Sequence, residues 1–152
     1  MKQITICCGI ILIILANTCA MASDLNVQLL DGKTGHPLKG KKFCISFSPD
    51  PNANGIDSPR VCSRTDANGS ADIKMPVPEP QTIHLAVLTN DLLPCFAIPN
   101  AFSISDLLAK GEVARNTCAG SAHEPAPRTG LLTAFAHQMT FLEGLKSMWQ
   151  EL

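Results

Sequence analysis

The sequence predicts a mainly β protein, an antiparallel β-sandwich with a short helical insertion and an amphipathic helix at its C-terminus. Apolar and polar residues alternate with period two along several segments, which is typical of half-buried strands. Clusters of Gly, Pro, Asn and Asp separate these segments and indicate turns. A chain of 152 residues is long enough for one domain with a genuine core. Its formal net charge of −1 gives no electrostatic reason to expect nucleic acid as a partner.

Two turns, at 31–40 and 65–70, carry most of this prediction. Each contains an Asp whose carboxylate can accept hydrogen bonds from the backbone that follows it, and glycines that tolerate positive φ. The residues that we expect to shape these turns are Asp31, Gly35, Asp66 and Gly69. Alternating segments flank both turns, so a strand is expected on each side. The predicted strands span 25–29, 42–47, 61–65, 70–75, 82–87 and 131–137.

The first residues predict export. A charged start and an apolar run at 4–16 precede the small-x-small pattern Ala-Met-Ala, which is typical of a secretory signal peptide. We therefore expect residues 1–22 to be removed before Ser23, which gives a secreted or periplasmic protein. A retained membrane helix is one alternative, although the run is shorter than the roughly 20 residues that cross a bilayer. Acylation at Cys19 is another, although bulky polar residues precede this cysteine.

Four cysteines remain after this cleavage, and an even number fits an oxidising compartment. Local pattern favours a bond between Cys44 and Cys62, which bracket a proline-rich loop at 49–59. It also favours a bond between Cys95 and Cys118, which bracket the helical insertion. Metal ligation by four thiolates is the rival interpretation, but the chain has no C-x-x-C pair to supply zinc-like spacing.

The phase of the alternation places Cys44 and Cys62 opposite the apolar residues of their strands. We therefore expect a cross-strand disulfide on the outer face of a sheet. In the chain-entropy model, closing a loop of this size stabilises the fold by about 3 kcal/mol.

The insertion contains a predicted short helix at 104–110. Ser103 can cap it, Asp106 stands in its first turn, and Gly111 can stop it. The stretch at 117–130 is rich in Ala, Pro, Gly and Ser and is expected to form an exposed loop.

A second helix is predicted at 139–152, where Thr140 and Glu143 form a capping box. We expect this helix to follow a sandwich domain at 23–138. Its apolar stripe packs on the sandwich, docks to a partner or lies on a membrane surface, and it is too short to span a bilayer. The apolar residues of this stripe are Phe141, Leu142, Leu145, Met148, Trp149 and Leu152.

The motifs D-G-K-T-G-H-P-L-K-G at 31–40 and T-D-A-N-G-S-A-D-I-K-M-P at 65–76, with an amphipathic strand between them, resemble a known pattern. They look like the carboxypeptidase regulatory-like domains of the transthyretin-like (prealbumin-like) group. The resemblance covers about residues 24–90 and implies a transthyretin-like (Ig-like) β-sandwich. It is specific for the fold. Members of this group accompany enzymes, build surface stalks, or bind carbohydrate or protein.

The remainder of the chain resembles a family of uncharacterised exported acidobacterial proteins. The resemblance rests on F-S-I-S-D-L-L-A-K-G-E-V at 102–113, a following cysteine, and M-T-F-L-E-G-L-K-S-M-W at 139–149.

Enzymes among relatives of this sandwich use residues that this chain lacks. Intradiol dioxygenases hold iron with two tyrosines and two histidines, and this chain contains no tyrosine. Transthyretin-like hydroxyisourate hydrolases end in Tyr-Arg-Gly-Ser, whereas residues 149–152 are Trp-Gln-Glu-Leu. The resemblance therefore implies a protein that is not an enzyme and has no catalytic residues, metal or other cofactor.

The histidines support the same expectation. His36 stands in a turn, His84 on the solvent side of a strand, His123 in a loop and His137 at a strand end. No two have the i, i+2 or i, i+4 spacing that would aim both at one metal ion, so all four are expected to be surface residues. No serine or free thiol has a general base beside it in the sequence.

The predicted function is an exported, non-enzymatic interaction or structural module with an unknown protein or carbohydrate partner. We expect its contacts at the loop 49–59, at the insertion 95–118, and at the terminal helix. The candidate contact residues of that helix are Phe141, Leu145, Met148 and Trp149. The first alternative is an envelope-associated protein anchored by its terminal helix or by an uncleaved signal segment. A transthyretin-fold enzyme is the second alternative.

Overall fold

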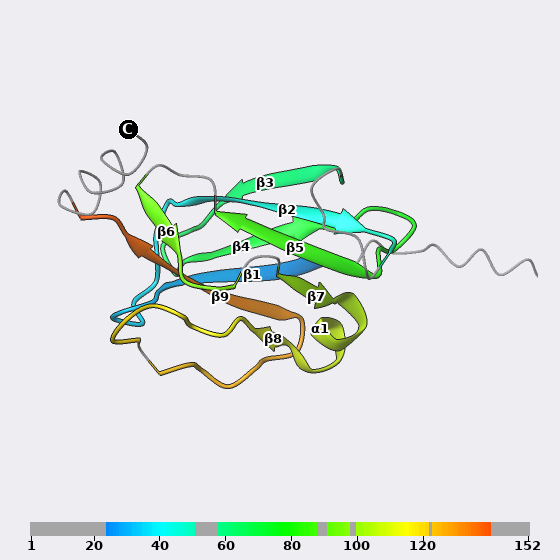
Figure 1. The fold of residues 1–152 in the computed structure, drawn as a ribbon. Coiled ribbons are helices and arrows are strands. Elements are labelled where there is room, and N and C mark those ends of the chain that lie inside the picture. Colours follow the sequence, from blue (N-terminus) through cyan, green and yellow to red (C-terminus); the bar gives the residue numbers. More distant parts are fainter. Residues whose placement is uncertain (1–23, 51–57, 88–90, 98–99, 122, 141–152) are drawn as a thin grey trace, which may run out of the picture.

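The computed structural model describes residues 24–50, 58–87, 91–97, 100–121 and 123–140. Within them, two β-sheets lie against each other, so the prediction of a mainly β protein is confirmed (Figure 1). One helix is present in this part of the chain. The elements are β1 (Asp24–Asp31), β2 (Lys42–Ser48), β3 (Arg60–Arg64), β4 (Ser70–Lys74), β5 (Thr82–Val87), β6 (Leu92–Pro94), β7 (Ala101–Ser103), α1 (Ile104–Lys110), β8 (Glu112–Val113) and β9 (Leu131–Gln138).

The first sheet has the strand order β4-β1-β9-β6, and β8 also pairs with β9. β4 and β6 are antiparallel to their neighbours, whereas β9 runs parallel to both β1 and β8. The prediction of an antiparallel sandwich is therefore wrong for these two pairs. The physical reason is the long connection that precedes β9, because parallel neighbours need a crossover rather than a hairpin.

The second sheet has the order β3-β2-β5-β7 and is antiparallel throughout. Its register sets Cys44 directly opposite Cys62. The structure contains the bond between these two cysteines and a second one between Cys95 and Cys118, the same pairs that the sequence analysis expected. Cys44 is buried and Cys62 is exposed at the sheet edge.

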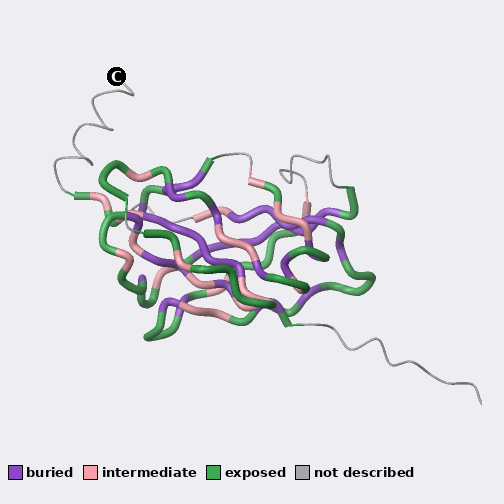
Figure 2. Tube along the Cα trace, turned by 90° about the horizontal axis from the view of Figure 1, so that it is seen from below, coloured by how far each residue is buried: buried purple, intermediate pink, exposed green. Residues whose placement is uncertain are grey.

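The main core lies between the two sheets. Apolar side chains that alternate along β1, β2, β5 and β9 meet there, and Figure 2 shows the buried segments following the strands while exposed residues gather in the connections. The largest fully buried side chains of this cluster are Leu25, Leu29, Phe43, Ile45, Ile73, Ile83, Ile104, Leu107 and Leu132. Each of the predicted strands contributes to this layer or borders it.

A smaller core lies on the other face of the first sheet. Phe135 stands between Ala134 and Ala136, which belong to the main core, so its side chain points to the opposite face. Phe135 packs there with Leu30 and Cys95 and is fully buried. The connection that leads from β8 to β9 passes along this side of β1 and β9 (Figure 1). This connection therefore covers what would otherwise be a solvent face.

The two predicted turns are built by their Asp side chains. Asp31 Oδ1 accepts hydrogen bonds from the Lys33 amide at 3.0 Å and from the Thr34 amide at 2.8 Å. Asp66 Oδ1 accepts them from the amides of Asn68 at 2.8 Å and Ser70 at 2.9 Å. Gly35 and Gly69 both have φ of 73°, in the left-handed region that glycine tolerates best.

α1 begins and ends as its sequence indicates. The Ser103 hydroxyl accepts a hydrogen bond from the Asp106 amide at 3.4 Å, and Gly111 follows the last turn with φ of 79°. No helix in the described part of the chain is long and apolar enough to cross a membrane. The predicted signal segment, most of the loop 49–59 and the terminal-helix residues 141–152 lie outside the described residues.

A substitution at Gly69 can measure how strongly the stability of the second turn depends on close backbone contact. A Cβ at this position would lie 2.6 Å from the Leu29 carbonyl oxygen, whereas a Cβ at Gly120, where φ is 68°, would meet nothing within 4 Å. Gly69→Ala should therefore reduce the free energy of unfolding by about 2–4 kcal/mol, and Gly120→Ala by only about 1 kcal/mol for its positive φ. Urea denaturation followed by far-UV circular dichroism measures both. Equal losses would show that the contact with Leu29 is unimportant.

Candidate functional site

The parallel pairing of β1 and β9 brings three polar side chains together. Asp31 and His137 stand near the carboxyl ends of these two neighbouring strands, and Lys33 lies in the turn after β1. His137 Nδ1 is 3.4 Å from Asp31 Oδ2, and Lys33 Nζ is 2.8 Å from His137 Nε2. Sequence analysis missed this cluster because Lys33 and His137 are 104 positions apart and only the strand order joins them.

Hydrogen bonds keep Asp31 ionised. Partial burial raises the pKa of Asp31, but the hydrogen bonds from the Thr34 amide and hydroxyl and the Lys33 amide, with a smaller contribution from the nearby His137 ring, together outweigh it, so that the pKa lies below its usual value. Lys33 Nζ lies within hydrogen-bond distance of His137 Nε2, and His137 Nδ1 faces the Asp31 carboxylate. At 3.4 Å this last contact is long for a hydrogen bond and is chiefly electrostatic.

The side chains of this cluster link two segments of the chain. An Asp–His pair can orient an imidazole for general-base catalysis when a hydroxyl or thiol lies at Nε2. Here the Lys33 ammonium lies at that nitrogen instead. The cluster therefore ties the turn after β1 to the end of β9. In the described residues, no group of three or more His, Cys, Asp or Glu side chains is arranged to hold a metal ion.

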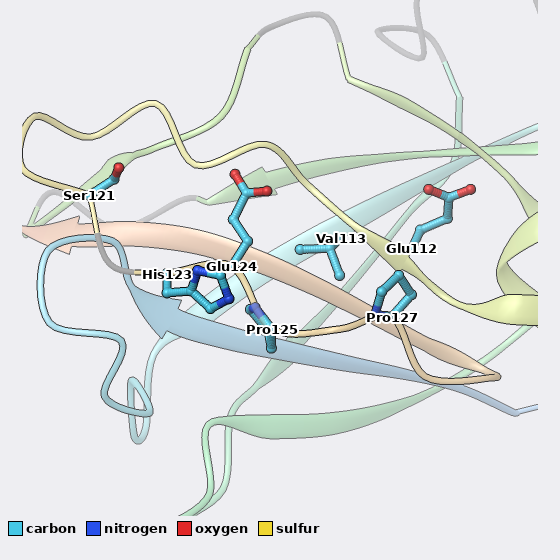
Figure 3. A pocket seen from close by; sticks show the side chains of 7 residues that line it. All are labelled: Glu112, Val113, Ser121, His123, Glu124, Pro125 and Pro127. Atoms are coloured by element: carbon cyan, nitrogen blue, oxygen red, sulfur yellow. The ribbon is translucent and has the colours of Figure 1, made fainter.

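A groove of about 660 Å³ opens between β8 and the loop that follows it. Figure 3 shows two prolines in its wall and the carboxylates of Glu112 and Glu124 extending to the same side. The groove is open to solvent, and its lining combines charge with apolar ring surface. The residues that line it are Glu112, Val113, Ser121, His123, Glu124, Pro125 and Pro127.

Asn116 attaches this groove to the sandwich. Its side-chain Nδ2 donates to the Gly32 carbonyl at 2.8 Å, and its Oδ1 accepts from the Cys118 amide at 3.2 Å. Its own amide donates to Glu124 Oε1 at 2.7 Å. Asn116 is buried, and its bond to the Gly32 carbonyl is protected from water, whereas the bonds to Glu124 and Cys118 are part-buried. Sequence analysis missed Asn116, because an isolated Asn in a polar loop gives no signal of its distant partners.

The second disulfide strengthens the same attachment. A Cβ on Gly32 would lie 2.7 Å from Cys95 Sγ and 3.0 Å from Cys118 Sγ. Position 32 must therefore lack a side chain if the disulfide is to pack against the turn. Three features therefore hold one wall of the groove in place. They are the disulfide between Cys95 and Cys118, the buried side-chain amide of Asn116, and the close approach of the sulfur atoms to the Gly32 backbone.

The prediction that His84 is a surface residue is wrong. His84 is 8% exposed and lies between Ser46 and Ala101 in the register of the second sheet. Because β5 is an inner strand, its side chains have neighbours on both sides, and burial extends to the outer face of that sheet. His36 and His123 are exposed as expected. The terminal contact residues Phe141, Leu145, Met148 and Trp149 lie beyond the described part of the chain.

Comparison with family models, with curated proteins and with solved structures finds no match for this chain. Membership of the carboxypeptidase regulatory-like group therefore stays a prediction.

Asp31 gives stability a defined pH dependence. Because folding lowers its pKa, the ionised carboxylate stabilises the fold above its ordinary pKa, about 3.9, and this contribution is lost as the pH falls through the folded value. Asp31→Asn should reduce the free energy of unfolding by about 1 kcal/mol at neutral pH, since hydrogen bonds to a charged acceptor are stronger than those to an amide.

Urea denaturation from pH 7 to pH 3 measures this difference, which should shrink below about pH 4. Asp24→Asn, at the exposed start of β1, is the matched control for loss of a carboxylate. A wild-type advantage over Asp31→Asn that stayed constant down to pH 3 would contradict the assigned role.

Proposed function

We propose that this chain is an exported, non-enzymatic β-sandwich module that binds a protein partner through the groove between β8 and the loop residues Ser121 and 123–127. The main support for this proposal is the groove, which is open to solvent and has one wall held in place by hydrogen bonds. Its open surface is large enough for side chains of a partner, and the wall next to Asn116 is fixed by hydrogen bonds. A preorganised surface loses little conformational entropy on binding.

The groove lining favours a partner with basic side chains. Glu112 and Glu124 supply two carboxylates, and Glu124 also accepts the Asn116 amide, which fixes its position. Pro125 and Pro127 supply rigid apolar surface beside them. A Lys or Arg side chain can place its methylene groups against the prolines and its charge near Glu112.

The polar cluster of Asp31, Lys33 and His137 supports a binding role rather than a catalytic one. His137 has one ring nitrogen toward Asp31 and the other within hydrogen-bond distance of Lys33, so its titratable atoms serve the fold. The two disulfides are compatible with an oxidising extracellular or periplasmic compartment. These observations support an exported module that functions by binding a partner at its surface.

Photo-crosslinking tests this function. A photoreactive amino acid replaces Ser121, an exposed residue of the groove, and in a second variant it replaces Lys74, an exposed residue of β4 that does not line it. Both proteins are expressed and irradiated in the native compartment. We expect a partner that is captured from position 121 and not from position 74. Equal capture from both positions would show that contact does not depend on the groove.

Affinity measurements with the purified partner then test the charge argument. Glu112→Gln should weaken binding roughly five- to tenfold, which corresponds to about 1–1.4 kcal/mol. Glu79→Gln removes an exposed carboxylate outside the groove and should change the affinity little. Isothermal titration calorimetry measures both. Equal affinities for the two variants would reject the groove as the contact surface.

A further inference from the structure

β3 (Arg60–Arg64) forms an open edge of the second sheet. It pairs with β2 on one side, and within the described residues no strand pairs with its other side. Four of its five residues are exposed and the fifth is half-buried. An unpaired strand edge presents a row of backbone donors and acceptors to other chains.

The outward backbone groups of β3 can be identified from its register. Phe47 donates its amide to the Pro59 carbonyl, and the Thr65 amide donates to the Lys41 carbonyl, so odd-numbered residues of this segment bond to β2. Cys62 belongs to the alternate set, and its Cα lies 4.0 Å from that of Cys44, as in a non-hydrogen-bonded pair. The N–H and C=O of Cys62 therefore point away from β2, toward the open edge.

The core is also incomplete at this edge. Val61 is opposite Ile45 in the register and lies on the core-facing side of the sheet. Ile45 is fully buried, whereas Val61 is 40% exposed. One more strand beside β3 would cover Val61 and extend the apolar layer.

The outer face of the same edge carries uncompensated positive charge. Lys42 and Arg64 are directly opposite each other in the register, an arrangement in which like charges repel. Arg64 donates to the Gly40 carbonyl, a neutral acceptor, and Lys42 has no ion-pair partner among the described residues. A hollow of about 310 Å³ is lined by Lys42, Cys62, Ser63 and Arg64. An anionic side chain seated there would relieve the repulsion.

We propose that the β3 edge binds an extended acidic segment of a partner protein by strand addition. The partner's backbone pairs with the outward groups of Cys62, an apolar side chain covers Val61, and its carboxylates face Lys42 and Arg64. A second copy of this chain fits less well. An antiparallel pair of β3 strands centred on Cys62 would place Arg60 of each copy opposite Arg64 of the other.

This edge belongs to the second sheet, and the acidic groove is lined by β8 of the first sheet and the loop that follows β8. The proposal goes beyond the groove function and does not depend on it. Failure at β3 would leave binding at the groove intact.

The test uses the purified oxidised protein and a fluorescent capped peptide of about eight alternating Glu and Val residues, a length within the usual range for strands. Fluorescence anisotropy at low ionic strength should detect binding. The same peptide with alternate backbone nitrogens methylated keeps its charge and loses its strand-pairing donors, and it should bind at least about tenfold more weakly. Equal binding of the methylated peptide would overturn strand addition.

Substitutions on the protein test the surface. Lys42→Gln with Arg64→Gln should weaken binding about tenfold, whereas Lys74→Gln on β4, the edge strand of the other sheet, should leave it unchanged. Lys42→Gln alone removes an exposed charge without touching the Arg64 hydrogen bond and should show a smaller loss in the same direction. An equal effect of Lys74→Gln would overturn the assignment to β3.

Two further readouts identify the bound species. Hydrogen exchange should slow at the Cys62 amide when the peptide is bound. Inorganic phosphate, added as a competitor at matched ionic strength, should fail to displace the peptide. Displacement of the peptide by phosphate would show that the site binds free anions. Peptide-induced protection confined to β4 or β7 would place the contact on another strand. Either result overturns the proposal. A protein that sediments as a dimer joined through β3 would likewise reject the acidic partner.

Discussion

The pairing of β9 with β1 is the constraint on which the rest of the described structure depends. The two strands are in parallel register over six positions, from Asn26 with Leu131 to Asp31 with Ala136. The free side of β9 then holds β8 near one end and β6 near the other. Since a parallel neighbour cannot be reached by a tight turn, the chain must travel outside the sheet before it enters β9. That excursion is the connection from β8 to β9, which lines one side of the groove.

Close packing at Gly32 makes the turn, the disulfide and the insertion behave as one unit. The sulfur atoms of Cys95 and Cys118 occupy the space that a side chain at position 32 would need. Asn116 uses its amide group to join the Gly32 carbonyl to the Cys118 amide. Each contact alone is worth only about 1 kcal/mol. Together they exclude water from a region where Phe135 and Leu30 complete a second core, and this rigidity gives the groove a defined shape.

Sequence reasoning succeeded where the determining contacts are local. The Asp31 and Asp66 turns, the cap of α1, and disulfides that span 18 and 23 positions all follow from neighbouring residues. Sequence reasoning failed where the contacts depend on strand order. The parallel pairing of β9, the burial of His84 and the cluster at His137 depend on which strands become neighbours, which periodicity does not encode. The strands β6, β7 and β8 are too short, at two or three residues, to show any period.

The net charge of the chain is close to zero, but the fold gathers acidic residues in one surface patch and basic residues in another. Twelve basic and thirteen acidic residues balance along the chain, yet the groove brings Glu112 and Glu124 together and the β3 edge brings Lys42 and Arg64 together. At physiological ionic strength, screening limits the influence of each patch to about 10 Å, so each acts on charges close to it. Electrostatic complementarity acts mainly on specificity and association rate. If both proposals hold, an acidic segment would favour the β3 edge and a basic one the groove.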